Sequence, residues 1–446
     1  MKTPIVDFVR GYMESGVARF HMPGHKGKTF LGPEPYDITE IGGADVLYSA
    51  EGIIAESEEC ATSFFATAHT FYSTEGSTLA IKAMLMLACG LAPRGERPLI
   101  LAGRNAHKAF IYGAALLDVD VEWLYPERAE HLCACEIDAQ SLEKSILTAA
   151  RKPCAVYVTS PDYLGRIADM RALACVCERF HIPLLVDNAH GAYLGFLEES
   201  LHPIALGASM CADSAHKTLP VLTGGAYLHI SKNAPREFLE NARHALSVFA
   251  STSPSYVILQ SLDTCNAYIA DGYRERLSDF VQRVGAAKER LFLAGFAPEE
   301  SEPLKIVINT AKRGYTGEYV GEYLRSCGIE AEFCDEEYAV FMVTPENSEE
   351  ELFRLTRAFE ALPVKAPMDI SPAVIKRGRA VMPLRAAMLA PSQTVLVKEA
   401  EGRICATPTV SCPPAIPIAV SGELITAHEV KLFERYGVEK IAVVKE

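Results

Sequence analysis

The chain has 446 residues, 49% of them hydrophobic and 22% charged, a composition typical of soluble globular proteins. At about 100–200 residues per domain, this length predicts two or three domains. The formal net charge of −14 argues against nucleic acid or an anionic membrane surface as a partner, because both would repel an acidic protein.

The N-terminal stretch MKTPIVDFVRGYMESG lacks the apolar core of a signal peptide, and no run approaches the ~18 apolar residues of a membrane span. We therefore expect a cytoplasmic protein. The cysteines are scattered, and the closest pairs, Cys133/Cys135 and Cys175/Cys177, have CxC spacing without a second matching pair beside either. We expect no metal site, and mostly buried free thiols.

Three apolar, β-rich runs predict buried strands. They are RPLILAG (97–103), PCAVYVTSP (153–161) and IPLLVDNAHG (182–191). Two further stretches, at 76–90 and 169–181, predict helices. This alternation predicts a mostly parallel α/β sheet covered by helices on both faces, over roughly residues 60–230.

The pattern changes after about residue 270. A long helix with a charged face is predicted over 271–295, and an alternation of strands with helices around 316–327 and 348–362 follows. This order predicts a smaller α+β domain, with the proline-rich C-terminal part as a third small unit or an extension of the second. The predicted division is an N-terminal segment (1–30), a large domain (31–270), a small domain (271–375) and a C-terminal extension (376–446).

Asp187 follows four apolar residues at the end of a predicted strand, where ligands of open α/β sheets bind. A helix N-cap is the alternative for Asp187 alone. Further along, SAHKT carries Lys217 beside small residues; a lysine amine can form a Schiff base with an aldehyde, although a surface lysine is the ordinary alternative. Together they indicate pyridoxal phosphate (PLP), which needs a lysine and an acid partner for its pyridine nitrogen.

PLP also needs a phosphate site. Gly76, Ser77 and Thr78 open a predicted helix, and their backbone N–H groups and hydroxyls suit a dianionic phosphate, with plain N-capping as the alternative. His107, just after a predicted strand, suits stacking on the cofactor ring, and a structural histidine is its alternative.

Seven motifs occur in a characteristic order. They are HMPGHKG (21–27), GSTLA (76–80), RNAHKA (104–109), TSPDYLG (159–165), DNAHGA (187–192), SAHKTLP (214–220) and STSPSY (251–256). In this order they resemble the ornithine/lysine/arginine decarboxylases, bacterial PLP enzymes of fold type I, the aspartate aminotransferase fold. The resemblance runs from about residue 18 to the end of the chain and is to the short form without an N-terminal wing domain.

The resemblance implies a role for each motif residue. Lys217 would bind PLP covalently, Asp187 would pair with its pyridine nitrogen, and His107 would stack on the ring. The phosphate would be held by Gly76, Ser77, Thr78, Ser214 and His216. His190 would lie near the ring oxygen or the substrate carboxylate, and Thr252 would reach this site or the partner subunit's. Lys217 or His216 would return a proton to Cα.

The reaction so implied is α-decarboxylation of a small cationic amino acid (arginine, lysine or ornithine) to an amine of polyamine biosynthesis. The resemblance also implies a homodimer or higher homo-oligomer with sites at the dimer interface. The substrate's distal cation requires a carboxylate that we leave unassigned. The acidic run CDEEY (334–338) is a candidate, but we interpret it as a solvated loop.

The chain departs from the family pattern at Glu75, where Asn is usual, at Asp162-Tyr163-Leu164, where two tyrosines are usual, and at Ala415, where Gly is usual. Two alternatives therefore stay open: another fold-type I reaction such as transamination, or a non-catalytic PLP-binding regulatory paralogue. No arginine has the context that an aminotransferase would need, and intact Lys217 and Asp187 argue against the paralogue.

Overall fold

The computed structural model describes residues 1–126, 131–408 and 416–445, so Ala415 lies outside the described residues. The chain forms two compact units. The first comprises Met1–Ile100, Arg151–Val158 and Met170–Glu275, and the second comprises Leu101–Ala150, Thr159–Asp169 and Arg276–Glu446. The four-part division expected from the sequence stays a prediction.

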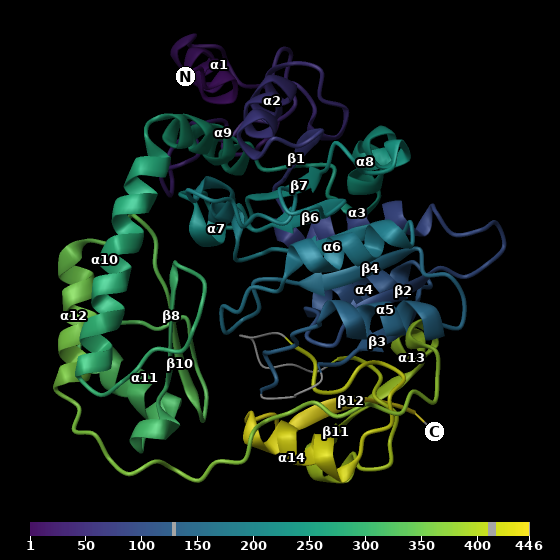
Figure 1. Ribbon diagram of the computed structural model, residues 1–446. Helices are drawn as coiled ribbons and strands as arrows, with labels where there is room; N and C mark the ends of the chain where they lie inside the picture. Colours follow the sequence, from purple (N-terminus) through teal and green to yellow (C-terminus); the bar gives the residue numbers. More distant parts are fainter. Residues whose placement is uncertain (127–130, 409–415, 446) are drawn as a thin grey trace. The chain divides into compact units, whose positions relative to one another are not determined.

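The first unit is built on a mostly parallel sheet with the strand order β1-β7-β6-β5-β4-β2. The strands are β1 (His69–Ser73), β2 (Leu99–Gly103), β4 (Ala155–Thr159), β5 (Leu184–Asp187), β6 (Met210–Asp213) and β7 (Ala226–Ile230). Strands β5 and β6 run parallel, whereas β7 is antiparallel to both of its neighbours, β6 and β1. The helices, seen in Figure 1, are α1 (Pro4–Glu14), α2 (Ile53–Phe65), α3 (Gly76–Cys89), α6 (Met170–Arg179), α7 (Ala215–Thr218), α8 (Arg236–Phe249) and α9 (Tyr256–Ala270).

Burial explains the apolar runs of this unit. Every residue of β5, β6 and β7 is buried. Helix α3 contacts β6, β7 and α8, which is why it is apolar around most of its surface. The strands and helices expected at 76–90, 97–103, 153–161, 169–181 and 182–191 are all present, and the α/β fold class is confirmed.

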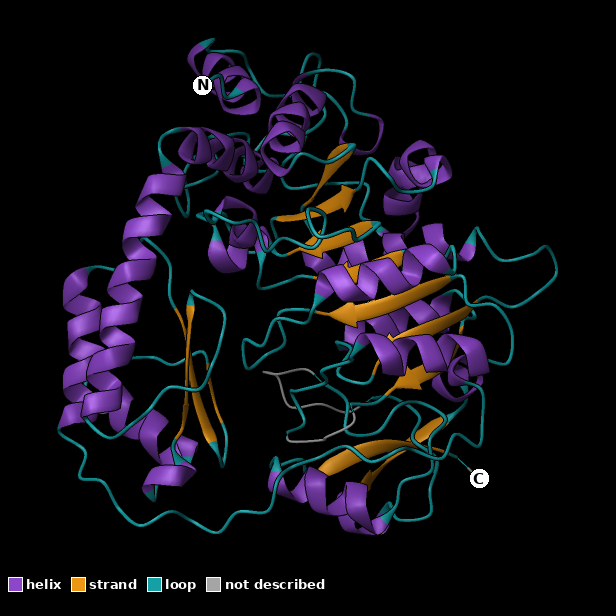
Figure 2. Ribbon diagram, viewed as in Figure 1, coloured by secondary structure: helices purple, strands orange, loops and turns teal. Residues whose placement is uncertain are grey.

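The second unit holds β3 (Asp120–Leu124) beside the end of β2, a three-stranded antiparallel sheet and a two-stranded one (Figure 2). The three-stranded sheet has the order β8 (Lys305–Asn309), β10 (Tyr338–Met342), β9 (Phe333–Cys334). The other sheet pairs β11 (Ser392–Leu396) with β12 (Lys440–Val444). The helices are α4 (Lys108–Leu116), α5 (Ala139–Thr148), α10 (Tyr273–Leu293), α11 (Gly317–Ser326), α12 (Glu349–Glu360), α13 (Leu384–Leu389) and α14 (Ala427–Arg435).

Both of these sheets contribute to one hydrophobic core. Val307 of β8 and Val340 of β10 belong to the same buried cluster as Val443 of β12 and Phe433 of α14. Helix α12 begins where Ser348 forms a capping box with Glu351, a pairing that satisfies two otherwise free N–H groups. The helices expected around 271–295, 316–327 and 348–362 are present as α10, α11 and α12.

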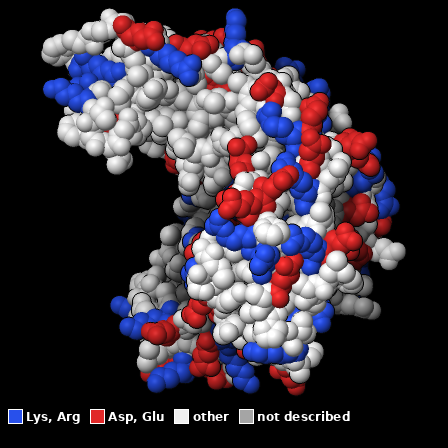
Figure 3. Space-filling view, turned by 90° about the vertical axis from the view of Figure 1, so that its left-hand side faces the viewer, with Lys and Arg blue, Asp and Glu red and all other residues white. Residues whose placement is uncertain are grey.

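The surface carries both signs of charge. Over the face drawn in Figure 3, lysine and arginine side chains are interspersed with aspartate and glutamate, so this face offers no continuous field of one sign. Within the described ranges, no helix combines the length and the apolarity that a bilayer crossing requires.

The N-terminus of α1 is capped by a distant carboxylate. Asp263 of α9 is buried and accepts hydrogen bonds from the backbone N–H groups of Ile5 (2.9 Å) and Val6 (3.0 Å) and from the Ser57 hydroxyl (2.6 Å). Pro4 brings no N–H of its own, so this carboxylate serves the first N–H groups of the helix. Burial raises the pKa of Asp263 from 3.8 to about 6, although these hydrogen bonds oppose the shift.

We expect this raised pKa to make stability depend on pH. The native state binds the proton of Asp263 more tightly than the unfolded state, so the stabilisation is full below about pH 4 and is lost as pH rises through about 6. Relative to Asp263→Asn, the wild type should therefore gain about 3 kcal/mol of unfolding free energy between pH 7 and 4. Urea-unfolding midpoints of both proteins at several pH values test this, and parallel curves would contradict it.

Candidate functional site

Asp187 lies at the carboxyl end of β5, in the first unit. Its partner across the parallel pair is Ala212 of β6, so the turn that follows β6 begins at the same edge of the sheet. The Asp187 carboxylate is 2% exposed and accepts hydrogen bonds from the Tyr157 hydroxyl (3.1 Å) and the Ala189 backbone N–H (3.2 Å). A carboxylate is thus held at the edge where open α/β sheets bind ligands.

The electrostatics of Asp187 favour a cationic partner. Burial raises its pKa above the usual value, and the positive charge of Lys217, followed by the Tyr157 hydrogen bond, opposes that rise. Burial also raises the pKa of Tyr157 well above its ordinary value, which keeps that hydroxyl protonated as a donor. A positive charge brought close to Asp187 would compensate its desolvation.

Helix α3 begins at Gly76, and the space beside the Gly76 Cα is open. Gly76 has a φ of +71°, a conformation that favours glycine, and no neighbouring atom lies within 4 Å of where a Cβ would stand. Its N–H donates to the Gly224 carbonyl (2.8 Å). The hydroxyl of Ser214, just before α7, donates to that of Ser77 (2.8 Å). Two hydroxyls and the positive end of a 14-residue helix therefore converge, with Thr78 half-buried beside them.

The short helix α7 carries His216 and Lys217, both half-buried. The backbone N–H of Lys217 donates to the Ser214 carbonyl (3.0 Å). The imidazole Nδ1 of His216 lies 2.9 Å from the Gly225 carbonyl, which can only accept, so Nδ1 carries a hydrogen. Burial lowers the pKa of His216 although the Gly225 hydrogen bond opposes this, so the ring is neutral and Nε2 presents a lone pair.

The remaining predicted residues lie in different settings. His190 is buried three positions after Asp187. Thr252 is exposed in the segment between α8 and α9, where the backbone N–H of the adjacent Ser251 donates to Glu75 (2.7 Å). His107 belongs to the second unit, where its Nδ1 accepts from the Ala109 N–H (3.1 Å) and caps α4, the structural role that we gave as its alternative.

The acidic run at 334–338 is not a solvated loop, and that interpretation was wrong. Asp335 is buried and accepts a hydrogen bond from His131 (3.0 Å). Arg435 forms ion pairs with Glu336 (2.6 Å) and Glu337 (2.7 Å). These carboxylates are engaged within the second unit, because its folding brings α14 against the end of β9.

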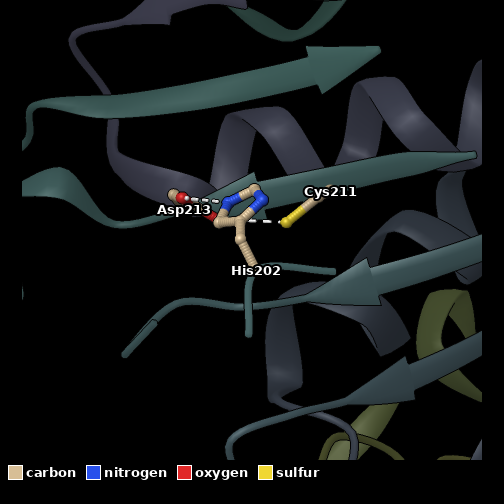
Figure 4. Close-up of side chains that lie close together, drawn as sticks. All are labelled: His202, Cys211 and Asp213. Carbon is tan, nitrogen blue, oxygen red and sulfur yellow. Dashed lines mark hydrogen bonds and ion pairs between the residues drawn. The ribbon is translucent and has the colours of Figure 1, made fainter. Parts of the chain in front are cut away.

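One polar cluster was missed by the sequence analysis. His202, Cys211 and Asp213 lie together behind α7, all buried, with ligand-type atoms within 4.8 Å of one another (Figure 4). His229 of β7 also contacts Asp213. The local sequence signal was weak: Cys211 and Asp213 lie two residues apart at a strand end, and the two histidines lie 11 and 16 residues from Asp213 on other elements.

Comparison with known proteins agrees with this arrangement. The family model of the Orn/Lys/Arg decarboxylase major domain matches residues 3–295. The arginine decarboxylase of Bacillus subtilis (strain 168) is 28% identical over 459 residues, which cover 96% of this chain and 92% of the relative. The arginine decarboxylase of Halalkalibacterium halodurans is 28% identical, covering 95% and 91%.

The solved structure of the constitutive lysine decarboxylase of E. coli aligns with a TM-score of 0.78 at 18% identity, covering 100% of this chain and 82% of that one, which shows a shared fold. The predicted PLP cofactor and amino acid decarboxylase class are confirmed by the family match. The chain belongs to the Orn/Lys/Arg decarboxylase family.

Proposed function

We propose that the protein removes the α-carboxylate of a basic amino acid, arginine in the first place, and forms an amine of polyamine biosynthesis in the cytoplasm. The observation that carries this proposal is the buried Asp187 beside Lys217, at the sheet edge that also holds the Ser77–Ser214 pair. Support for arginine comes from the arginine decarboxylases that match this chain over nearly its whole length.

The residues of the first unit fit PLP. The N-terminus of α3, open above Gly76 and flanked by the hydroxyls of Ser77 and Ser214, suits the phosphate. Asp187 is a buried acid whose pKa burial raises, as expected of a group that awaits a cation. Lys217 would bond to the aldehyde carbon. When bound, PLP supplies the electron sink for the pair released as the Cα–carboxylate bond breaks.

Asp187 would hold the proton of the ring nitrogen. Its charge stabilises that proton in a site from which water is largely excluded, since the carboxylate is 2% exposed. Tyr157 and the Ala189 N–H orient the carboxylate and need not move during turnover. The residue therefore contributes preorganised charge rather than a proton transfer of its own.

Lys217 is our choice for the group that returns a proton to Cα. The neutral His216 has its one N–H directed to the Gly225 carbonyl, so its other nitrogen can accept but not donate. The Lys217 amine would have protons to give to Cα whenever it is not bonded to the cofactor. His216 then serves to accept a hydrogen bond beside it.

We further propose a homodimer, or a higher homo-oligomer, that covers the segment around HMPGHKG. Phe20 is 95% exposed, Phe30 79% and Leu31 88%, all in a stretch without regular secondary structure. Such apolar exposure is unfavourable in water, and burial against a second copy would relieve it.

Turnover with a panel of substrates tests the reaction. Incubated with PLP and arginine, lysine or ornithine, the protein should release CO₂ and the matching amine, with the highest kcat/KM for arginine. Formation of a keto acid would indicate transamination instead, and absence of both products would contradict the proposal.

Lys217→Ala should reduce kcat by about 10³-fold or more, because both the covalent anchor and the proton donor are lost. Borohydride reduction of the wild type should fix PLP on the peptide that contains Lys217. Lys232→Ala, an exposed lysine of the same unit, is the control and should keep wild-type activity. Retained turnover in Lys217→Ala would remove the assigned role.

Ser214→Ala should weaken PLP binding by about 10- to 150-fold, since a hydrogen bond to a charged group contributes roughly 1.5–3 kcal/mol. Fluorescence titration of the apoprotein with PLP measures the dissociation constant. Ser63→Ala removes an exposed hydroxyl that donates to Cys60 and should leave this constant unchanged. Equal affinities for both variants would place the phosphate elsewhere.

A further inference from the structure

The buried cluster behind α7 is centred on the carboxylate of Asp213 (Figure 4). Its Oδ2 lies 3.0 Å from Nε2 of His202 and 3.2 Å from Nε2 of His229. Its Oδ1 accepts from the Asn188 amide (2.8 Å) and from the Cys211 thiol (3.1 Å). Asp213 is completely buried, yet four donors surround it.

The protons of the cluster can be assigned from these contacts. Nδ1 of His202 accepts from the Ile204 backbone N–H (3.4 Å), so its hydrogen is on Nε2 and points to Asp213. Burial lowers the pKa of His229, so that ring is neutral, with Nδ1 facing the Thr70 hydroxyl (2.9 Å) and Nε2–H facing Asp213. Each ring thus gives one hydrogen to the carboxylate.

This arrangement favours hydrogen bonding over a metal ion. Burial, and then the charge of Asp213, raises the pKa of Cys211 well above its ordinary value, so the thiol stays protonated. Burial alone would raise the pKa of Asp213, but His202 and His229 lower it well below its usual range. Four donors satisfy the ionised carboxylate of Asp213 without a metal. A metal ion bound here would have to displace the protons that His202, His229 and Cys211 direct at that carboxylate.

The same carboxylate connects the two strand ends of the candidate site. Asn188 directly follows Asp187, and its side-chain amide crosses from β5 to Asp213 at the end of β6. The backbone N–H of Asn188 also donates to the Ala212 carbonyl (3.0 Å). Asp213 is followed by Ser214, whose carbonyl accepts from the Lys217 N–H. One buried anion therefore holds both turns.

We infer that Asp213 is a positioning residue of the decarboxylation site: through Asn188 it fixes Asp187 relative to the turn that carries Lys217. This inference rests on the proposed roles of Lys217 and Asp187. Groups that orient catalytic residues act through geometry held to within about 0.5 Å, so loss of the connection should slow the reaction more than it weakens substrate binding.

The test removes the connecting amide alone. Asn188→Ala in the holoenzyme should lower kcat about 10- to 100-fold, with KM for arginine within about threefold of wild type. In the same variant, the visible absorption band of bound PLP should shift, and the dissociation constant of PLP should rise. Asn266→Ala is the matched control, because Asn266 is equally buried in the same unit but donates to Ser57 and Tyr72 rather than to β6.

Asp213→Asn is the second variant: should Asn188→Ala not fold, Asp213→Asn alone should lower kcat about 10- to 100-fold, with KM for arginine within about threefold of wild type. Where both single variants fold, the two changes are also combined. In the double variant the losses should be no larger than in the more affected single variant, since both changes break one connection. The inference would be overturned if Asn188→Ala and Asn266→Ala lost the same fraction of kcat for the same decrease in melting temperature. It would also be overturned if kcat of Asn188→Ala were unchanged. A stoichiometric metal in the purified wild type would overturn it as well. A wild type that releases no CO₂ would instead refute the proposed function.

Discussion

The candidate site depends on the burial of two carboxylates at the ends of adjacent parallel strands. Asp187 ends β5 and Asp213 ends β6, and neither is more than 2% exposed. Burial disfavours the ionised form of both carboxylates. The negative charge of Asp213 also raises the pKa of Asp187, in the same direction as burial. The surroundings of the two carboxylates nevertheless differ, and so do the directions in which their pKa values are shifted.

The difference lies in the supply of donors. Asp213 receives four hydrogen bonds, and His202 and His229 hold its pKa well below its usual range despite burial. Asp187 receives two, and its pKa stays raised. Neighbouring acids whose pKa values are pushed apart commonly have separate roles. Asp213 is satisfied by its own surroundings, whereas the raised pKa of Asp187 is consistent with its proposed role beside a cationic group.

Sequence patterns predicted the elements around this site well, because buried parallel strands such as 182–191 require continuous apolar runs that are legible locally. They also brought Lys217, Asp187 and the Gly76–Ser77 helix start to attention. Periodicity could not reveal that His202 and His229 turn toward Asp213, since such contacts are made by tertiary folding. The same limit applies to Asp335, whose acidic neighbours suggested solvent exposure before His131 and Arg435 enclosed the run.

The departures from the family pattern at Glu75 and Asp162 are accommodated by local contacts. Glu75 makes no side-chain cap on α3. Its carboxylate instead accepts a hydrogen bond from the Ser251 N–H, beside the N-terminus of that helix. In the second unit Asp162 is buried, and burial raises its pKa to about 6. Its carboxylate accepts from the Arg166 N–H (3.0 Å), and the Lys305 ammonium lies near its carbonyl while pairing with Glu302 (2.6 Å). A buried acid with a raised pKa is costly to keep in a folded protein, so Asp162 is held in place against the desolvation of its carboxylate. Of the departures within the described residues, Asp162 is therefore the buried acid, whereas Glu75 is exposed to solvent.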